Sequence, residues 1–150
     1  MSLTVVKGLQ SEILVPITTP MVWTPVEKEL KDMTVALATA AGVHQIDQER
    51  FNLAGDFTWR KIDDKCPSDK LMVSHGGYDN SDVNKDINCM FPIDRLHELV
   101  AEGFIKATAP YHAGFMGGGG NQEKFKHETG PAVAAMLKEE NVDAAILTAG

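Results

Sequence analysis

The side chains best suited to chemistry in this chain are gathered in residues 74–95. This segment, SHGGYDNSDVNKDINCMFPIDR, carries one histidine, four aspartates and three asparagines beside a Gly-Gly pair. An imidazole beside carboxylates and amides on a loop is typical of sites that move protons or hold a polar substrate. The same composition also fits a solvated connection rich in Asx turns, with His75 capping a turn, so both interpretations stay open at this point.

Residues 79–86 contain three aspartates and two asparagines, as calcium-binding loops do. A loop of the EF-hand type needs glycine at its sixth position and glutamate at its twelfth. Neither is found when counting starts at Asp79 or at Asp82. The sequence therefore argues against a calcium loop.

Three histidines, His44, His75 and His112, are each expected just after a strand and together could bind zinc or another divalent ion. They lie far apart in the sequence without the local spacing of metal ligands, so we predict no metal site. The two cysteines, Cys66 and Cys89, do not form a CxxC pair and are expected to be reduced thiols.

A run of four glycines at residues 117–120 precedes a predicted helix. Free backbone N–H groups at such a junction favour phosphate or carboxylate, which makes Gly117 and Gly118 candidate substrate ligands. The run fits neither the GxGxxG fingerprint nor the GxxxxGK[ST] loop, and a mobile hinge or a subunit-facing loop is an equal alternative. Arg60 or Arg95 could clamp a substrate carboxylate, although a surface ion pair is the commoner fate of an arginine.

The composition bounds the class of protein. With 150 residues, of which 43% are hydrophobic, the chain can bury one ordinary core, so we expect a single globular domain. The net charge of −7 and the scattered lysines and arginines argue against nucleic acid or an anionic membrane as a partner. No stretch has the length and basic flank of a signal peptide or membrane span, which predicts a cytoplasmic protein.

Strands are predicted wherever β-prone runs end in turn residues. Residues 1–33 contain several prolines and are expected to form an extended arm, followed by an α/β domain at residues 34–150. The run TVALATA predicts a buried strand that ends near Gly42. We predict further strands at residues 56–62, 70–73, 104–109 and 143–148, of which the last is buried and the second leads directly into the His75 loop.

Two helical segments complete the pattern. The clearer one is predicted at residues 92–103, where a proline begins it, apolar residues recur at helical spacing and Gly103 ends it. The other follows the glycine run, with Thr129 as a cap and Pro131 either kinking the helix or starting a new one. His112 and the glycines are expected to form a loop before it.

This alternation predicts an α/β fold with a mainly parallel sheet and flanking helices, Rossmann-like or doubly wound but incomplete. In such sheets the loops after the carboxyl ends of the strands meet at one edge, where ligands bind. We therefore expect Gly42, His75, His112 and the last residues of the chain to lie together.

Three stretches are distinctive when they are read together: VSHGGYDNSDVNKDINCMFPIDRLHELVAEGFI, APYHAGFMGGGG and the final NVDAAILTAG. In this order and spacing they resemble the selenoprotein B family of glycine, sarcosine, betaine and D-proline reductases. The blocks SHGGYDN and FPIDRL are the most specific parts. The likeness is strongest to the D-proline reductase members and covers nearly the whole chain.

The resemblance implies reductive cleavage of the C–N bond at the α-carbon of an amino acid, with D-proline opening to 5-aminovalerate. A pyruvoyl group on a partner subunit would hold the substrate, and this chain itself would carry no cofactor. In the family, the strand that resembles DAAILTAG is followed at once by a redox-active selenocysteine or a cysteine.

The nucleophile is therefore expected immediately after Gly150, the last residue of the sequence. The resemblance implies that the chain stops just before it, with a UGA codon read as stop, and is inactive by itself. Gly150 and the N–H groups after it would form the turn that exposes selenium, as in a nucleophile elbow.

On this interpretation the residues before the nucleophile have supporting roles. His75 or His112 would supply a proton to the leaving amine or stabilise the selenolate, and Asp79 would orient the imidazole. Neither cysteine takes the place of the nucleophile. The candidate substrate ligands are Asn80, Asp82, Arg95, Gly117 and Gly118.

The implied partners are the pyruvoyl-containing subunit and further subunits of a homo- or hetero-oligomer. One alternative is the equivalent subunit of glycine, sarcosine or betaine reductase, or a paralogue that acts on another amine. An alternative of another class is a module that binds an amino acid or anion through the glycine run and the arginines, without redox chemistry.

Overall fold

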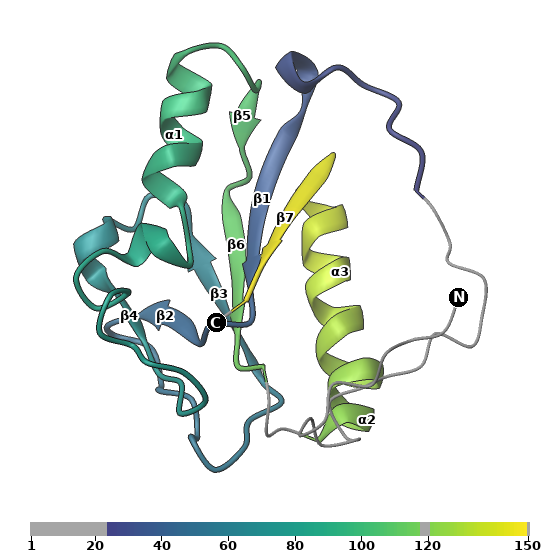
Figure 1. Ribbon diagram of the computed structural model, residues 1–150. Coiled ribbons are helices and arrows are strands. Elements are labelled where there is room, and N and C mark those ends of the chain that lie inside the picture. Colours follow the sequence, from purple (N-terminus) through teal and green to yellow (C-terminus); the bar gives the residue numbers. More distant parts are fainter. Residues whose placement is uncertain (1–23, 118–120, 150) are drawn as a thin grey trace, which may run out of the picture.

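Strand β1 (Thr34–Thr39) is the centre of the main sheet, at the place where the run TVALATA predicts a strand (Figure 1). A computed structural model describes residues 24–117 and 121–149. One edge of β1 pairs in parallel with β5 and then β6, and the other edge pairs in parallel with β7. β3 joins β6 in the antiparallel direction. The bounds of these strands are β3 Trp59–Asp63, β5 Ala107–Thr108, β6 Tyr111–Phe115 and β7 Ala144–Thr148.

Helices α1 (Ile93–Ala101) and α3 (Gly130–Glu139) cover opposite faces of the sheet. Alternate residues of β1 point to opposite faces, so Val35 and Leu37 share a core with α1, while Ala38 packs with Val133 and Met136 of α3. Figure 1 shows β1 and β7 between these two helices. The predicted α/β fold with a mainly parallel sheet and flanking helices is confirmed.

The first predicted helix is confirmed as α1, with Pro92 before it and Gly103 in the left-handed conformation (φ 71°) after it. The second segment is continuous: α2 (Gln122–Lys124), a π-helical turn (Phe125–Thr129) and α3. Pro131 therefore lies in the first turn of α3 and does not interrupt the helical segment. Thr129 occupies the N-cap position of α3, but its side chain does not cap the helix, because its hydroxyl donates to the carbonyl of Phe57.

Two strands were not predicted. β2 (Val43–Gln45) pairs antiparallel with β4 (Leu71–Val73) in a separate two-stranded sheet. β6 occupies the stretch that the sequence assigned to a loop around His112. Pro110 separates β5 from β6 because proline cannot donate to the ladder, and this interruption hides the second strand in the sequence.

β7 was expected to be buried, but the side chains of Ile146 and Leu147 are 41% and 76% exposed. The reason is its place in the sheet: among the described residues β7 pairs only with β1 and so forms an edge. Residues 24–32 of the predicted arm are exposed and include a 3-10 turn (Leu30–Asp32), Met33 at its end is buried in the core, and residues 1–23 lie outside the described residues. In the described ranges, no helix combines the length and the apolar character that crossing a membrane requires.

Candidate active site

The peptide groups of Ala40 connect the ends of three strands. Ala40 follows β1, and its N–H donates to the carbonyl of Thr148 at the end of β7 (2.9 Å). Its carbonyl accepts from the N–H of Gly117, just after β6 (2.9 Å). We call Ala40, Gly117 and Thr148 the Ala40 junction. Because β1, β6 and β7 are parallel, their carboxyl ends meet here, as the sequence predicts for this edge of the sheet.

His75 attaches the loop after β4 to this junction. The N–H of Gly77 donates to Nδ1 of His75 (2.9 Å), so Nδ1 carries no hydrogen in this arrangement. The hydrogen therefore lies on Nε2, which donates to the carbonyl of Gly117 (2.8 Å). The half-buried His75 ring is thus held as a neutral imidazole between its own loop and the end of β6.

Tyr78 packs against His75, with ring centroids 4.8 Å apart and planes tilted by 44°. Its hydroxyl donates to the carbonyl of Ala41, one residue beyond the Ala40 junction (2.9 Å). Burial raises the pKa of the Tyr78 hydroxyl, so the group stays protonated at neutral pH. Tyr78 is not among the residues predicted from the sequence to form the site; its spacing of three residues from His75 in a turn-rich loop was the available signal.

A second histidine fixes the start of the same loop. His44 is fully buried, and its Nδ1–H donates to the carbonyl of Gln45 (2.8 Å), which leaves Nε2 as an acceptor for the hydroxyl of Ser74 (2.9 Å). Burial lowers the pKa of His44, which agrees with this neutral form. The N–H of Ser74 in turn donates to the carbonyl of Gly42 (2.9 Å). The loop therefore leaves β4 in a fixed direction.

The second half of the predicted polar segment closes over the ends of β1 and β7. The hydroxyl of Thr148 donates to the carbonyl of Met90 (2.6 Å), and the hydroxyl of Thr39 lies 3.4 Å from the same oxygen. Asn88, which begins this turn, donates its amide hydrogens to Asp86 and Asp94. Part of the polar character of residues 74–95 therefore serves to shape the loop, as the Asx-turn interpretation expects.

His112 lies elsewhere and is fully buried in β6. Between their paired residues, β1 has two residues and the β5–β6 segment has four, so the N–H of Leu37 lacks a partner in the ladder. Nδ1 of His112 accepts this N–H (3.0 Å), and Nε2 donates to the carboxylate of Asp64 (2.9 Å). The expectation that His112 follows a strand at the loop edge is wrong, because its side chain completes the interior of the sheet.

Asp64 gathers three donors in this interior cluster. His97 of α1 and His112 bond to one oxygen, each at 2.9 Å, and Thr108 of β5 donates to the other at 2.8 Å. Burial by itself raises the pKa of Asp64, but these hydrogen bonds and the charge of His97 outweigh it and lower the pKa to about 2. We call His112, Asp64, His97 and Thr108 the Asp64 cluster.

Three other candidate residues bond to their own neighbours and do not converge on the Ala40 junction. Asp79 accepts from the N–H of Ser81, so it does not orient the His75 ring. Asp82 is exposed and pairs with Lys85 (3.0 Å), and Arg95 is exposed and pairs with Glu98 (2.6 Å). These are surface ion pairs.

Asn80 and Gly117 lie close to His75. The Asn80 amide donates to the carbonyl of His75 (2.8 Å), while its buried Oδ1 has no partner among the described residues. Gly117 is held on both sides, by Ala40 and by His75. Two of the candidate ligands are thus brought to the junction.

Two positions that the sequence predicts to belong to the site lie outside the described residues. Gly118 was a candidate substrate ligand, and Gly150 was expected to come directly before the nucleophile. The described part of the chain ends one residue earlier, at Ala149, which follows the junction residue Thr148. The substrate role of Gly118 and the turn at Gly150 therefore stay predictions.

The described residues contain no group of three or more His, Cys, Asp or Glu placed to hold a metal ion. Both cysteines are free thiols. Burial and the nearby Asp47, Asp63 and Asp69 raise the pKa of Cys66, which is the opposite of what an activated thiolate needs. The described residues at the Ala40 junction can therefore orient groups and form hydrogen bonds.

Residues 5–150 match the family described as glycine/sarcosine/betaine reductase selenoprotein B. The chain is 70% identical over 148 residues to D-proline reductase subunit gamma of Acetoanaerobium sticklandii, a match that covers 99% of this chain and 61% of that protein. No solved structure matches the chain.

More distant relatives belong to complexes with other substrates in their names. Glycine reductase complex component B subunit gamma of Carboxydothermus hydrogenoformans is 35% identical, and sarcosine reductase complex component B subunit beta of Peptoclostridium acidaminophilum is 31% identical. Each match covers 83% of this chain and 29% of the relative. The chain spans less than two thirds of the length of all three relatives. It belongs to the selenoprotein B family of the glycine, sarcosine and betaine reductases.

Proposed function

We propose that this chain is part of the selenium-bearing subunit of a D-proline reductase-type enzyme, which opens D-proline to 5-aminovalerate. The observation that carries the proposal is the 70% identity to D-proline reductase subunit gamma across 99% of the chain, against 35% for the glycine reductase relative. The relatives are longer than this chain, so the activity is proposed for the assembled enzyme.

The reaction breaks the bond between the α-carbon and the ring nitrogen of D-proline. The α-carbon and the nitrogen each end with one more hydrogen, and the electron pair comes from a dithiol that is oxidised to a disulfide. A selenolate that follows β7 and Gly150 would supply the nucleophile, while a pyruvoyl group on a partner subunit would hold the substrate. Both groups lie outside the described residues.

The geometry of the Ala40 junction supports this placement. Thr148 brings the end of β7 to the carboxyl edge of the sheet, where loops of α/β proteins form sites. Of the three candidate catalytic residues, His75 lies at the junction and Asp79 lies on the same loop, while His112 is enclosed in the Asp64 cluster. We therefore place the substrate and the nucleophile beside His75, with Asn80 and Gly117 as nearby polar groups.

The names of the relatives, which are subunits of reductases, support a partner subunit, and we propose that this partner is the pyruvoyl-containing one. An oligomer also agrees with the exposed apolar residues Ile146 and Leu147 on the edge strand. The anion-binding module receives less support, since Arg95 is paired with Glu98 on the surface.

The test is to produce the complete subunit together with its pyruvoyl-containing partner and to supply a dithiol reductant. D-proline, glycine, sarcosine and betaine are offered separately, and products are measured by mass spectrometry. We expect 5-aminovalerate from D-proline only, and we expect iodoacetate to abolish turnover only after reduction. Reduction of glycine, sarcosine or betaine instead would reassign the substrate. Binding of an amino acid by the chain alone, with no reduction by the complex, would favour the module.

A further inference from the structure

We propose that Tyr78 and His75 form a positioning pair: Tyr78 holds the His75 ring, and the Nε2–H of His75 fixes Gly117 at the Ala40 junction. In this arrangement His75 acts through its hydrogen bond rather than by transferring a proton. The inference deepens the proposed function, and it rests on that function only where turnover is measured.

Both ring nitrogens of His75 are already in use. Nδ1 accepts from Gly77 at 2.9 Å, and Nε2 donates to the carbonyl of Gly117 at 2.8 Å. A second proton on Nδ1 would face the N–H of Gly77, and loss of the Nε2 proton would leave the carbonyl of Gly117 opposite a lone pair. Gain of a proton at Nδ1 would therefore break the bond from Gly77 within the loop, and loss of the Nε2 proton would break the bond that attaches the loop to Gly117.

Gly117 is the residue whose position this bond controls. Its N–H already donates to Ala40 (2.9 Å), and a Cβ on Gly117 would stand 3.0 Å from the Cβ of Ala40, so the two backbones are in close contact. His75 supplies the bond on the other side of the same residue. Together the two bonds set the distance between the end of β6 and Ala40, which in turn is bonded to the end of β7 at Thr148.

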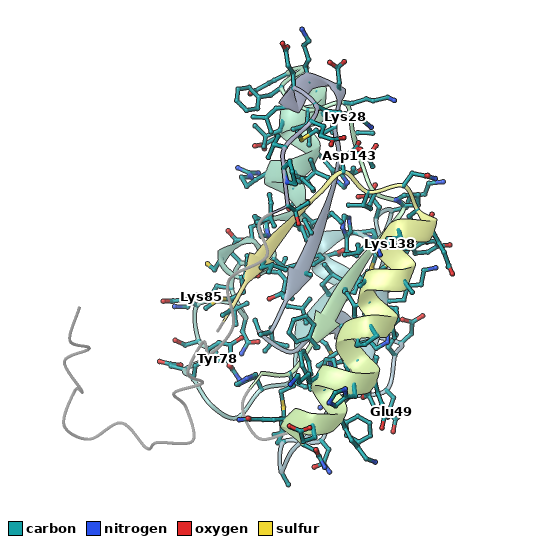
Figure 2. The ribbon with its side chains drawn as sticks, turned by 90° about the vertical axis from the view of Figure 1, so that its right-hand side faces the viewer. Lys28, Glu49, Tyr78, Lys85, Lys138 and Asp143 are labelled. Carbon is teal, nitrogen blue, oxygen red and sulfur yellow. The ribbon has the colours of Figure 1, made fainter. Side chains whose placement is uncertain are left out.

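Tyr78 explains why the His75 ring keeps this orientation although it is only half buried. The tyrosine ring covers one side of the imidazole, and the hydroxyl is anchored to the carbonyl of Ala41. Asn80 adds a bond to the main chain of His75 at 2.8 Å. Figure 2 shows Tyr78 and Lys85 on the side of the molecule opposite Lys138 of α3. We call this side, formed by the loop that contains His75, Tyr78 and Lys85, the loop face.

Two substitutions at His75 separate positioning from proton transfer. In His75→Gln the side-chain amide nitrogen can reach the place of Nε2 and donate to Gly117, although glutamine transfers no proton at neutral pH. In His75→Asn the side-chain oxygen can replace Nδ1 and accept from Gly77, but no donor reaches Gly117. Tyr78→Phe removes the anchor to Ala41 and keeps the ring. Lys85→Gln is the control, because Lys85 is an exposed residue of the same segment whose ion pair is with the exposed Asp82.

Hydrogen exchange of the segment around Gly117 is measured in the full chain, and kcat and KM for D-proline are measured in the assembled enzyme. We expect His75→Asn to speed hydrogen exchange around Gly117, because the end of β6 loses one of its bonds. We also expect kcat to fall about 10- to 100-fold with less change in KM, because groups at the carboxyl edge of the sheet would be misplaced. His75→Gln should stay within about threefold of the parent in both readouts, and Tyr78→Phe should fall between the two. Lys85→Gln should match the parent.

The inference is overturned if His75→Gln loses as much kcat as His75→Asn while exchange around Gly117 is unchanged in both, since that result identifies proton transfer. It is equally overturned if none of the three variants changes the exchange. If the parent enzyme fails to reduce D-proline, the proposed function is wrong. The exchange measurements still decide whether the pair positions Gly117.

Discussion

His75 and His112 both have two bonded ring nitrogens, but their surroundings differ. His112 is fully buried and joins four elements of the fold through Asp64, Leu37 and their neighbours. His75 is half buried, and within the described ranges its ring bonds to main-chain groups of two loops. The first arrangement stabilises the whole domain, while the second sets the position of one strand end. A histidine with both ring nitrogens hydrogen-bonded can therefore contribute to stability or to local geometry. Full burial beside a charged partner favours the first role, and partial burial beside main-chain groups favours the second.

The largest expected effect tests the interior side of this comparison. His112→Ala leaves the N–H of Leu37 without a partner, removes one donor from Asp64 and opens a cavity beside Phe91, whose ring lies 5.7 Å from that of His112. We expect the free energy of unfolding to fall by about 4 kcal/mol, measured by urea denaturation. His127→Ala is the matched control, because His127 is 65% exposed and should change stability by less than about 0.5 kcal/mol. Equal losses of free energy of unfolding in the two variants would show that the buried position of His112 gives it no special role in stability.

The next prediction concerns the backbone that supports the His75 loop. Gly42 has φ 75° and lies so close to Ser74 that an added Cβ would collide with the Ser74 carbonyl. Gly42→Ala should lower the free energy of unfolding by about 3 kcal/mol, from left-handed strain together with the collision. Gly103 has nearly the same φ, 71°, but open space around it, so Gly103→Ala should cost only about 1 kcal/mol. Similar losses of free energy of unfolding in the two variants would show that the His75 loop shifts to accommodate the added Cβ at little cost.

A pH titration probes the Asp64 cluster in the unmodified chain. The folded-state pKa of Asp64 is lowered from 3.8 to about 2, and its side chain is only 19% exposed. A lowered carboxyl pKa stabilises the fold above the unfolded-state value, so this contribution is complete above about pH 4 and is lost as the pH falls towards 2. The loss should be about 2 kcal/mol. In Asp64→Asn the free energy of unfolding should depend less steeply on pH over this range. If the curves of the variant and the parent were parallel, Asp64 would not be the cause of the pH dependence.

The smallest effect on stability is expected at the loop face. Tyr78→Phe removes one hydrogen bond to Ala41 and keeps the ring packed on His75, so the free energy of unfolding should fall by about 1 kcal/mol. The measurement is the same urea denaturation that is used for His112→Ala. A loss as large as that of His112→Ala would place the loop face in the same stabilising role as the interior.

Local patterns in the sequence determined several elements correctly. The β-prone run at residues 34–40 became β1, and the helix that starts after Pro92 and ends at Gly103 became α1. These assignments depend on interactions within a few residues, such as apolar periodicity and a glycine that can adopt positive φ. The motifs SHGGYDN and FPIDRL also indicated the family, which the comparison confirms.

Only the tertiary structure decided what each histidine does. Sequence position placed His112 and His75 alike after strands, because an interrupted ladder at Pro110 and its unpaired N–H at Leu37 are visible only when β5 and β6 lie beside β1. The same holds for Tyr78, whose partners Ala41 and His75 come together through the fold of the loop. Local propensity acts over a few residues, whereas hydrogen-bond partners and burial depend on segments far apart in the chain. The sequence by itself therefore determined the class of fold and the family, and the packing of strands determined which side chains form the site.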